Sequence, residues 1–591
     1  MQNKFFAIIE DHEMILQKNR VVYNILGYSK LFLVFAILVL MYFNVSRGFP
    51  PVLVIASIAT FVLLVVLWIR HIKVQDDLDY AEGIIRICKQ SIDRITGDWT
   101  SFADTGVEFS CAKHAYAGDL DIVGSKSLFQ FLNTTNTWHG RQQFADDLLH
   151  PKYEPIELQK RQEAISELST DTDFSNKMQY CLSKIGADSS AVALVRKLED
   201  KMPFMKSKLI KMLLIYIPAI TLAFIIGMLV FQKENLYAIG GGIIVAAQIM
   251  VWIIGIPKTR AYLKTMSSLP YKLSAYSAAI SALTDKEFSS EKLNQIQTQL
   301  HTASKAMKEL GRIADKIRAT HNGLFYFILN AFLLWDYECA CSLEEWKNKY
   351  ADSAEEWFAA VGEFESLLCF SHIPNACNNT CLPTIAETGH AIEAQDIGHP
   401  LLSNETRVDN DLRFDHNIFI ISGSNMSGKT TFLRTVGINL VLARCGSFVC
   451  AKEMVCPMFE IMTSMRISDD LNEGVSTFYA ELKRIKSIVA FAQQNTQTFF
   501  LIDEIFRGTN SVDRLIGAKT VISKLNALGV SGMVSTHDLE LCELAEIHTR
   551  IKNYSFSEHY TNDAIHFDYQ IQPGVSKTTN AQYLMQMIGI T

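Results

Sequence analysis

Residues His416–Thr431 read HNIFIISGSNMSGKTT, and this segment indicates the fold of the C-terminal part of the chain. The apolar run Ile418–Ile421 is typical of a buried strand, and a helical pattern, FLRTVGINLVLA, follows the loop. Between them, Gly423–Thr430 has the form G-x-x-x-x-G-K-T. Glycines let backbone N–H groups turn inward around phosphate oxygens, and the following helix adds the positive end of its dipole. The sequence therefore predicts a phosphate-binding loop in an α/β P-loop NTPase domain.

The side chains of this loop have separate expected roles, with ATP and Mg²⁺ as the expected ligands. Lys429 supplies positive charge to the β- and γ-phosphates, and the hydroxyl of Thr430 can ligate Mg²⁺. A glycine-rich turn formed by chance is the alternative, and the strand before and the helix after it disfavour that alternative. The expected nucleotide-binding residues are Gly423, Ser424, Asn425, Met426, Ser427, Gly428, Lys429, Thr430 and Thr431.

Two further segments carry polar residues where predicted strands end. The segment Thr498–Glu504 (TFFLIDE) is an apolar strand that ends in two carboxylates. Asp503 suits a phosphate-bound Mg²⁺, and Glu504 is placed to orient or deprotonate the attacking water. The segment Ser535–Asp538 (STHD) follows another apolar strand pattern, so that His537 can sense the γ-phosphate. A solvated acidic loop and a structural histidine are the alternatives for these residues.

Together these motifs resemble those of the MutS family, the ATP-driven clamps of DNA mismatch repair. The phosphate loop includes Asn425 and Met426, which generic loops of this type lack, and Leu501–Asp513 resembles the family's Walker B segment. SDDLNEGVSTFYAEL (Ser468–Leu482) resembles the family's signature loop. The resemblance implies that Ser476 of one subunit reaches the γ-phosphate bound by its partner. A homodimer with composite ATP sites is therefore expected.

A second resemblance lies upstream of the ATPase segment. Asp121–Leu168 resembles the start of the family's helical core domain, in which helices connect DNA-facing levers to the ATPase. Thr137, Gly140 and Arg141 hold the positions of that domain's Thr-x-x-Gly-x-Arg element. The resemblance implies that the levers act on DNA. Apolar residues at spacings of three and four also predict a long helix with a core-packing face, formed by Leu293, Ile296, Leu300, Ala303, Met307 and Leu310.

Composition indicates membrane segments joined to globular domains. The chain has 591 residues, 55 Lys+Arg against 62 Asp+Glu (net charge −7), and 49% hydrophobic residues, which excludes a disordered chain. A hydrocarbon core of about 30 Å needs about 20 helical residues. A signal peptide is the alternative for the first predicted span, and buried core helices for the last two. The four predicted transmembrane helices, in two hairpins, are Leu31–Val45, Phe49–Ile69, Met212–Phe231 and Leu236–Ile256.

The distribution of basic residues predicts the orientation of these hairpins. Of the basic residues near the predicted spans, only Arg47 and Lys233 lie in the short connectors inside the two hairpins. Because positive charge concentrates on the cytoplasmic side, the protein is expected to be a multi-pass protein of the inner (cytoplasmic) membrane, with the core and ATPase domains in the cytoplasm. The residues that flank the outer ends are Lys18, Arg20, Lys30, Arg70, Lys73, Lys206, Lys208, Lys211, Lys258, Arg260 and Lys264.

These observations predict a multidomain chain of α and α/β parts. The first hypothesis for its function is a membrane-anchored, MutS-like ATPase that acts on DNA. The family's mismatch-reading domain and its Phe-x-Glu wedge are not found, and the second hairpin falls where the family inserts its DNA clamp. A DNA-independent membrane remodelling, transport or scaffold ATPase is therefore the alternative. The predicted parts are a cytoplasmic segment (1–29), hairpin 1 (30–70), a linker with the first part of the core (71–204), hairpin 2 (205–257), lever helices with the rest of the core (258–382) and the ATPase domain (383–591).

Two smaller segments have further patterns of aromatic and alternating residues. The aromatic residues of Leu324–Phe327 and Trp335–Tyr337 could stack on nucleic-acid bases, although a packed helix end is favoured. The segment Ile551–Gln572 alternates apolar and polar residues across a Thr-Asn-Asp turn. It predicts a hairpin at the edge of the ATPase sheet.

Overall fold

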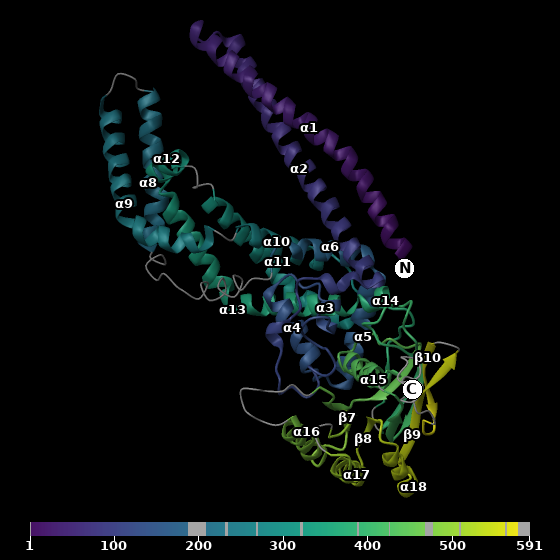
Figure 1. Ribbon diagram of the computed structural model, residues 1–591. Coiled ribbons are helices and arrows are strands. Elements are labelled where there is room, and N and C mark those ends of the chain that lie inside the picture. Colours follow the sequence, from purple (N-terminus) through teal and green to yellow (C-terminus); the bar gives the residue numbers. More distant parts are fainter. Residues whose placement is uncertain are drawn as a thin grey trace. The chain divides into compact units, whose positions relative to one another are not determined.

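The computed structural model of the protein describes residues 2–186, 208–230, 235–267, 270–318, 323–386, 389–424, 426–466, 477–506, 510–561 and 564–576. Two of the predicted site residues, Asn425 and Ser476, lie outside these ranges. The chain forms two compact units (Figure 1). The first comprises Met1–Ser101 with Thr172–Tyr180, and the second comprises Phe102–Asp171 with Cys181–Thr591.

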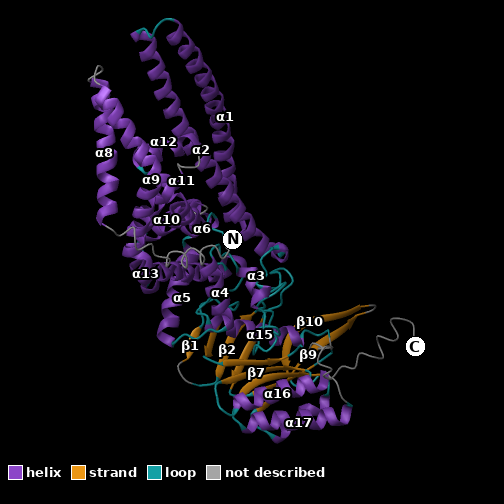
Figure 2. Ribbon diagram, turned by 90° about the vertical axis from the view of Figure 1, so that its left-hand side faces the viewer, coloured by secondary structure: helices purple, strands orange, loops and turns teal. Residues whose placement is uncertain are grey.

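The first unit is built on a long helical hairpin, α1 (Gln2–Ser46) and α2 (Pro51–Thr96), whose helices run side by side in Figures 1 and 2. Pro51 is at the start of α2, where a missing N–H costs nothing, and Gly97 ends it at φ 97°. Near the turn the buried amide of Asn44 donates to Leu53 O (3.3 Å) and Ser57 Oγ (2.9 Å). Beyond this contact the hairpin exposes large apolar side chains along both helices.

Among the described residues, three helices are long and apolar enough to cross a membrane: Gln2–Ser46, Pro51–Thr96 and Ile239–Arg260. They contain most or all of the first, second and fourth predicted spans. The third predicted span lies in α8 (Lys208–Val230), which contains a shorter apolar stretch, Leu214–Phe224. Four transmembrane helices therefore remain a prediction, with three of them supported by helix length and composition.

The second unit begins with a helical part. Its long helix α11 (Glu291–Arg318) confirms the predicted helix, because the six apolar residues of the expected face are all buried in the core. Gly140 of α4 (Trp138–Leu149) lies so close to α13 (Trp335–Phe370) that a Cβ there would clash with the side chain of Glu365. The helices are η2 (Val107–Phe109), α3 (Leu128–Leu132), α4 (Trp138–Leu149), α5 (Pro155–Thr170), α8, α9 (Asn235–Ser267), α10 (Pro270–Thr284), α11 (Glu291–Arg318), α12 (Gly323–Leu333), α13 (Trp335–Phe370) and α14 (Ile373–Ala376). The helix α6 (Thr172–Ser183) contributes residues to both units, and η1 (Asp98–Ser101) ends the first.

Two sheets follow in the C-terminal part of this unit. The larger has the order β10-β9-β4-β8-β7-β6, and its strands are parallel except for β10. Its strands are β4 (Ile418–Ser422), β6 (Glu460–Ser464), β7 (Thr498–Asp503), β8 (Ser531–Thr536), β9 (Ile551–Thr561) and β10 (Ala564–Pro573). The smaller sheet has the order β1-β5-β2-β3, from β1 (Thr384–Ala386), β5 (Glu453–Pro457), β2 (Ala391–Ile397) and β3 (Asn410–Asp415). The hairpin of β9 and β10 confirms the predicted edge hairpin.

Helices cover both faces of the larger sheet, as Figure 2 shows. Ile418 and Ile420 of β4 pack into one core with residues of α16 (Thr477–Ala492) and α17 (Ser511–Ala527). On the other face, α15 (Lys429–Arg444) approaches so closely that a Cβ on Gly437 would be 2.8 Å from Leu501 Cδ1. Because parallel strands are buried on both faces, β4, β7 and β8 are apolar runs without alternation. Two short helices, η5 (Leu539–Glu543) and α18 (Leu544–Ile547), lie between β8 and β9.

Candidate nucleotide-binding site

The loop after β4 has the backbone geometry of a phosphate-binding loop. Its glycines Gly423 and Gly428 have φ values of 149° and 102°, which side-chain-bearing residues rarely adopt. Ser427 Oγ donates to Ser424 O (2.8 Å) and closes the loop on itself. The helix α15 begins directly at Lys429, so that the positive end of its dipole faces the loop.

The lysine of this loop is held next to the backbone that would surround phosphate. Lys429 is 3% exposed, and its Nζ donates to Gly423 O (2.7 Å) and Ser424 O (2.6 Å). A buried ammonium is costly unless it is paired or hydrogen-bonded. Phosphate oxygens of a nucleotide would offer the same cation a stronger, charge-assisted set of acceptors.

A hydroxyl and a carboxylate meet where β4 and β7 end. Thr430 Oγ1 donates to Asp503 Oδ2 (3.0 Å), and the other carboxylate oxygen accepts a hydrogen bond from Ser535 of β8. Hydroxyl, carboxylate and phosphate oxygens are the ligands that Mg²⁺ prefers. The donor set of Thr430 and Asp503 therefore fits this ion. Ser535 fixes the orientation of the carboxylate from the neighbouring strand.

Of the four predicted catalytic residues (Lys429, Ser476, Glu504 and His537), Glu504 and His537 lie side by side at the ends of β7 and β8. Glu504 has φ 52°, and its backbone N donates to Ser535 O (3.1 Å). This left-handed backbone turns the side chain away from the strand direction, an arrangement often found at functional sites. Glu504 Oε1 lies 3.6 Å from His537 Nδ1, and the Glu504 side chain is 15% exposed. The structure thus brings Lys429, Thr430, Asp503, Glu504 and His537 to one edge of the sheet.

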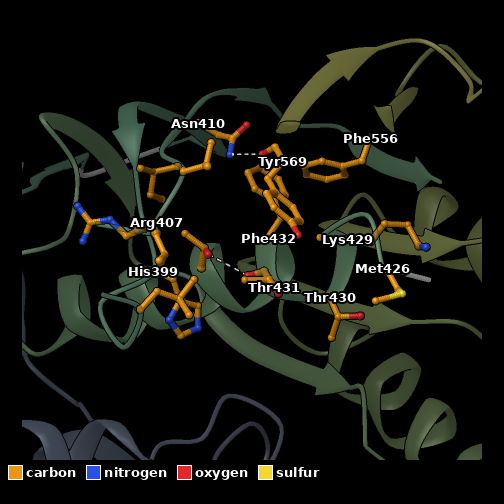
Figure 3. A pocket seen from close by; sticks show the side chains of 16 residues that line it. His399, Arg407, Asn410, Met426, Lys429, Thr430, Thr431, Phe432, Phe556 and Tyr569 are labelled. Atoms are coloured by element: carbon orange, nitrogen blue, oxygen red, sulfur yellow. Dashed lines mark hydrogen bonds between the residues drawn. The ribbon is translucent and has the colours of Figure 1, made fainter. Parts of the chain in front are cut away.

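A cavity of about 520 Å³ opens beside the phosphate loop (Figure 3). Its wall combines the start of α15 with the hairpin of β9 and β10, through the aromatic rings of Phe432, Phe556 and Tyr569. Tyr569 has φ 54° at a bulge in β10. Its ring lies close to the phosphate loop: a Cβ added to Gly428 would be 3.1 Å from Tyr569 Cδ1. Asn410 holds this bulge in place by donating to Tyr569 O (3.0 Å) and accepting from Ile571 N (2.8 Å).

The opposite wall of the cavity carries polar groups. Burial, together with the positive charges of Arg434 and Arg407, lowers the pKa of His399 to about 3, so its ring is neutral near pH 7. Arg407 donates from Nε to Asp409 Oδ1 (2.7 Å). The cavity therefore offers aromatic faces, a neutral ring and a paired cation next to the phosphate loop, which is suited to an aromatic base.

Residues 419–590 match the family model of MutS domain V. The DNA mismatch repair protein MutS of Natronomonas pharaonis is 30% identical over 261 residues, which cover 43% of this chain and 30% of that relative. The MutS of Thermus aquaticus is 34% identical over 194 residues, which cover 32% of this chain and 23% of that relative. The matched region thus spans less than a third of the length of these relatives. The C-terminal part of the chain is similar to MutS, in agreement with the motifs.

Several residues of the MutS-like site were not singled out from the sequence. Ser535 is the first residue of the STHD motif, two residues before His537, so that a signal for it was present. Glu558 of β9 accepts a hydrogen bond from Ser424 Oγ (2.7 Å), and Tyr569 reaches the loop from β10. These two residues are far from the loop in sequence, and alternation in a hairpin does not indicate which of its side chains approach a neighbouring loop.

The helix that starts at the MutS-like phosphate loop ends against the helical core. Cys445 O, just past α15, accepts from Arg161 Nε (3.0 Å), and Arg161 Nη2 donates to Asp147 Oδ2 (2.9 Å). Ser366 of α13 donates to the same oxygen of Asp147 (2.5 Å). Arg444 Nη2 donates to the carbonyl of Pro151 (3.0 Å). This cluster joins α4, α5 and α13 to the end of α15.

A second junction holds the strand that leads into the signature segment. The carboxylate of Asp119 accepts from Thr463 Oγ1 (2.6 Å), Met465 N (3.2 Å) and Arg466 N (2.8 Å). Arg466 also pairs with Asp121, which accepts from Arg434 Nη1 on α15 (2.9 Å). The segment before the core helices is thus bound to the end of β6. Ser476 itself lies outside the described residues.

Proposed function

We propose that the protein binds and hydrolyses ATP in a Mg²⁺-dependent reaction at the MutS-like site. One observation carries the proposal: a phosphate loop with Lys429, an Mg²⁺ donor pair and a carboxylate for water activation meet at the carboxyl edge of one sheet. The nucleotide's phosphates lie along Gly423–Thr430, and its base lies in the cavity beside Tyr569. The experiment that tests this function is phosphate release from ATP by the detergent-solubilised chain with and without Mg²⁺.

In this proposal each side chain acts at a stated atom of the reaction. Lys429 and the backbone N–H groups neutralise charge on the phosphate oxygens, and Thr430 and Asp503 hold Mg²⁺, which supplies further positive charge there when bound. Glu504 accepts a proton from the water that attacks the γ-phosphorus. The bond from this phosphorus to the bridging oxygen breaks, which leaves ADP and phosphate. His537 donates a hydrogen bond to the γ-phosphoryl group and orients Glu504.

We also propose that two copies of the chain complete each other's sites through Ser476. The support is the signature-like segment that follows Arg466 and the firm attachment of the preceding strand by Asp119. ATP binding would draw two ATPase domains together, and hydrolysis would release them. The junction of Arg161, Asp147 and Ser366 would pass this movement from α15 to the long helix α13. Hairpin helices α1, α2, α8 and α9 would anchor the chain in a membrane.

The base pocket gives a first quantitative prediction. Tyr569→Ala should raise the Kd for ATP by roughly 5- to 150-fold, because stacking of a base on an aromatic ring contributes about 1–3 kcal/mol. Tyr569→Phe keeps the ring and should keep the affinity. The measurement is a titration with a fluorescent ATP analogue. Equal Kd values for Tyr569→Ala and the wild type would mean that the base lies elsewhere.

We propose that the ATP-driven movement acts on DNA, because the curated relatives carry the name of DNA mismatch repair proteins. Binding to DNA should weaken steeply with salt, since contacts to phosphates release counterions. Filter binding across a salt series, on homoduplex, mismatched and branched DNA in parallel, measures this slope. If no DNA is retained at low salt, with or without a nonhydrolysable ATP analogue, the DNA proposal is wrong and the ATPase proposal stands.

A DNA-independent membrane ATPase is the second candidate function. The observation that favours it is the N-terminal end of α13, which packs against the apolar helices α9 and α12. The net charge of −7 also favours a function without DNA. In this case the ATP-driven movement would act on the membrane segments. The DNA titration above separates the two candidates.

A further inference from the structure

The backbone turns twice directly after β7, at the residue proposed as the base and just beyond it. Glu504 and Phe506 have φ values of 52° and 64°, in the left-handed region. Residues that carry a side chain are strained in this region, and they persist there only where the surrounding structure fixes them. The contacts that fix this turn therefore also fix the direction of the Glu504 side chain.

The helix α16 supplies two contacts to this turn. The backbone N of Phe506 donates to Glu481 Oε1, and Glu481 is 2% exposed. The ring of Phe478 meets the ring of Phe506 edge to face, with centroids 5.6 Å apart. Phe478 and Glu481 are three residues apart and therefore lie on the same side of the helix. One side of α16 thus binds both the backbone and the ring of Phe506.

The helix α17 closes the other side of the Phe506 ring. The two helices lie side by side against the larger sheet (Figures 1 and 2). A Cβ added to Gly517 of α17 would be 2.7 Å from Phe506 Cε2. Phe506 belongs to the buried core that includes Ile485 of α16 and Ala518 of α17. Because its ring is enclosed in this way, the turn at Phe506 follows the position of the two helices.

The helix α16 is also bound to the strand next to β7. Arg484 Nε donates to the carbonyl of Thr463 in β6 (2.8 Å), and its Nη2 donates to the carbonyl of Ala115 (2.8 Å). In the sequence, Glu481 follows Ser476, the predicted contact with a partner's nucleotide, by five residues. The helix that holds the turn after β7 is therefore the one that follows the signature-like segment.

We propose that Glu481 is a positioning residue for ATP hydrolysis, which holds the turn after β7 so that Glu504 is directed at the attacking water. The inference rests on the proposed ATPase function. Without the carboxylate, the buried N–H of Phe506 loses an acceptor, and the strained turn loses a contact that fixes it. Nucleotide binding depends on the loop of Lys429, which belongs to a different segment.

Two substitutions at position 481 of the full, detergent-solubilised chain test the proposal. Glu481→Met keeps the length of the side chain but removes the oxygen that accepts from Phe506 N, whereas Glu481→Gln keeps an amide oxygen there. Lys486→Ala, at an exposed position of the same helix, is the control. Phosphate release gives kcat and KM, a fluorescent ATP analogue gives Kd, and hydrogen exchange measures the protection of the backbone.

The expected result for Glu481→Met is a kcat lower by about 10- to 100-fold at an unchanged Kd, because a displacement of about 1 Å can cost on the order of 100-fold. Hydrogen exchange should increase in the peptide that contains Phe506 and not in the one that contains Lys429. Glu481→Gln should hydrolyse ATP faster than Glu481→Met, and Lys486→Ala should match the wild type. A role in the stability of the domain alone would increase exchange in both peptides.

Hydrolysis by Glu481→Met at the wild-type rate, or a Kd that rises together with the loss of kcat, would overturn the positioning role and leave the ATPase proposal in place. Equally lowered kcat values for Glu481→Gln and Glu481→Met would overturn it as well. If Glu481→Met does not fold, Phe478→Leu, which weakens the ring contact with Phe506, decides: a lower kcat at an unchanged Kd supports the role, and a wild-type kcat overturns it. If the wild type itself releases no phosphate, the proposed function fails, and this inference fails with it.

Discussion

Glu504→Gln is expected to slow ATP hydrolysis by a factor on the order of 10²–10⁴ while ATP still binds. The amide keeps the size and the hydrogen bonding of the side chain, but it cannot accept the proton of the attacking water. Lys429, Thr430 and Asp503, which hold the phosphates and the metal ion in our proposal, remain unchanged. Steady-state phosphate release measures the loss, and a titration with a fluorescent ATP analogue measures the retained affinity.

Glu393→Gln is the matched control for this variant. Glu393 lies exposed on β2 of the smaller sheet, so that the same chemical change should leave hydrolysis at the wild-type rate. If Glu504→Gln and Glu393→Gln both hydrolyse ATP like the wild type, Glu504 is not the base. If Glu504→Gln loses ATP binding as well, the residue acts in positioning the loop and not in proton transfer.

Arg161→Ala is expected to lower the free energy of unfolding of the second unit by about 3–5 kcal/mol, since it leaves a buried carboxylate without its cation. Arg161 and Asp147 are 0% and 2% exposed and lie 2.9 Å apart. The substitution also removes the hydrogen bond to Cys445 O and the packing of the guanidinium on Tyr153, 4.1 Å from its ring centroid. Chemical denaturation of the detergent-solubilised chain measures the change.

The control for this prediction is an exposed ion pair in the same unit. Arg413 and Glu393 lie 3.5 Å apart and are 86% and 59% exposed, so that Arg413→Ala should cost at most about 1 kcal/mol. Equal effects of the two arginine substitutions would contradict a buried junction at Arg161. Loss of ATPase in Arg161→Ala at temperatures where the chain is folded would further support coupling through α15.

Local patterns were sufficient to predict the centre of the site. A strand, a glycine-rich loop and a helix occur in direct succession around Lys429, and the carboxyl ends of parallel strands meet at one edge. Asp503, Glu504 and His537 were therefore predicted together, and the structure places them together. The apolar spacing of α11 was also sufficient, because periodicity reports directly on which face of a helix is buried.

Features that depend on tertiary contacts were not predictable in the same way. Asp147 and Arg161 resemble surface charges of two ordinary helices, and their contacts with α13 and with the end of α15 depend on the tertiary fold. Tyr569 reaches the phosphate loop because a bulge with positive φ turns β10. Hydropathy predicted that the first membrane span begins at Leu31. The helix that contains it, α1, begins earlier, at Gln2, because polar residues do not interrupt a helix.

The central claim is that ATP binds at the loop that carries Lys429 and is hydrolysed there. The most direct measurement is simultaneous ATP binding and phosphate release by the purified full chain with Mg²⁺, beside Lys429→Ala. We expect saturable binding and Mg²⁺-dependent hydrolysis in the wild type, and loss of both in the variant. Absence of ATP binding in the wild type, or hydrolysis at equal rates in the two proteins, would contradict it.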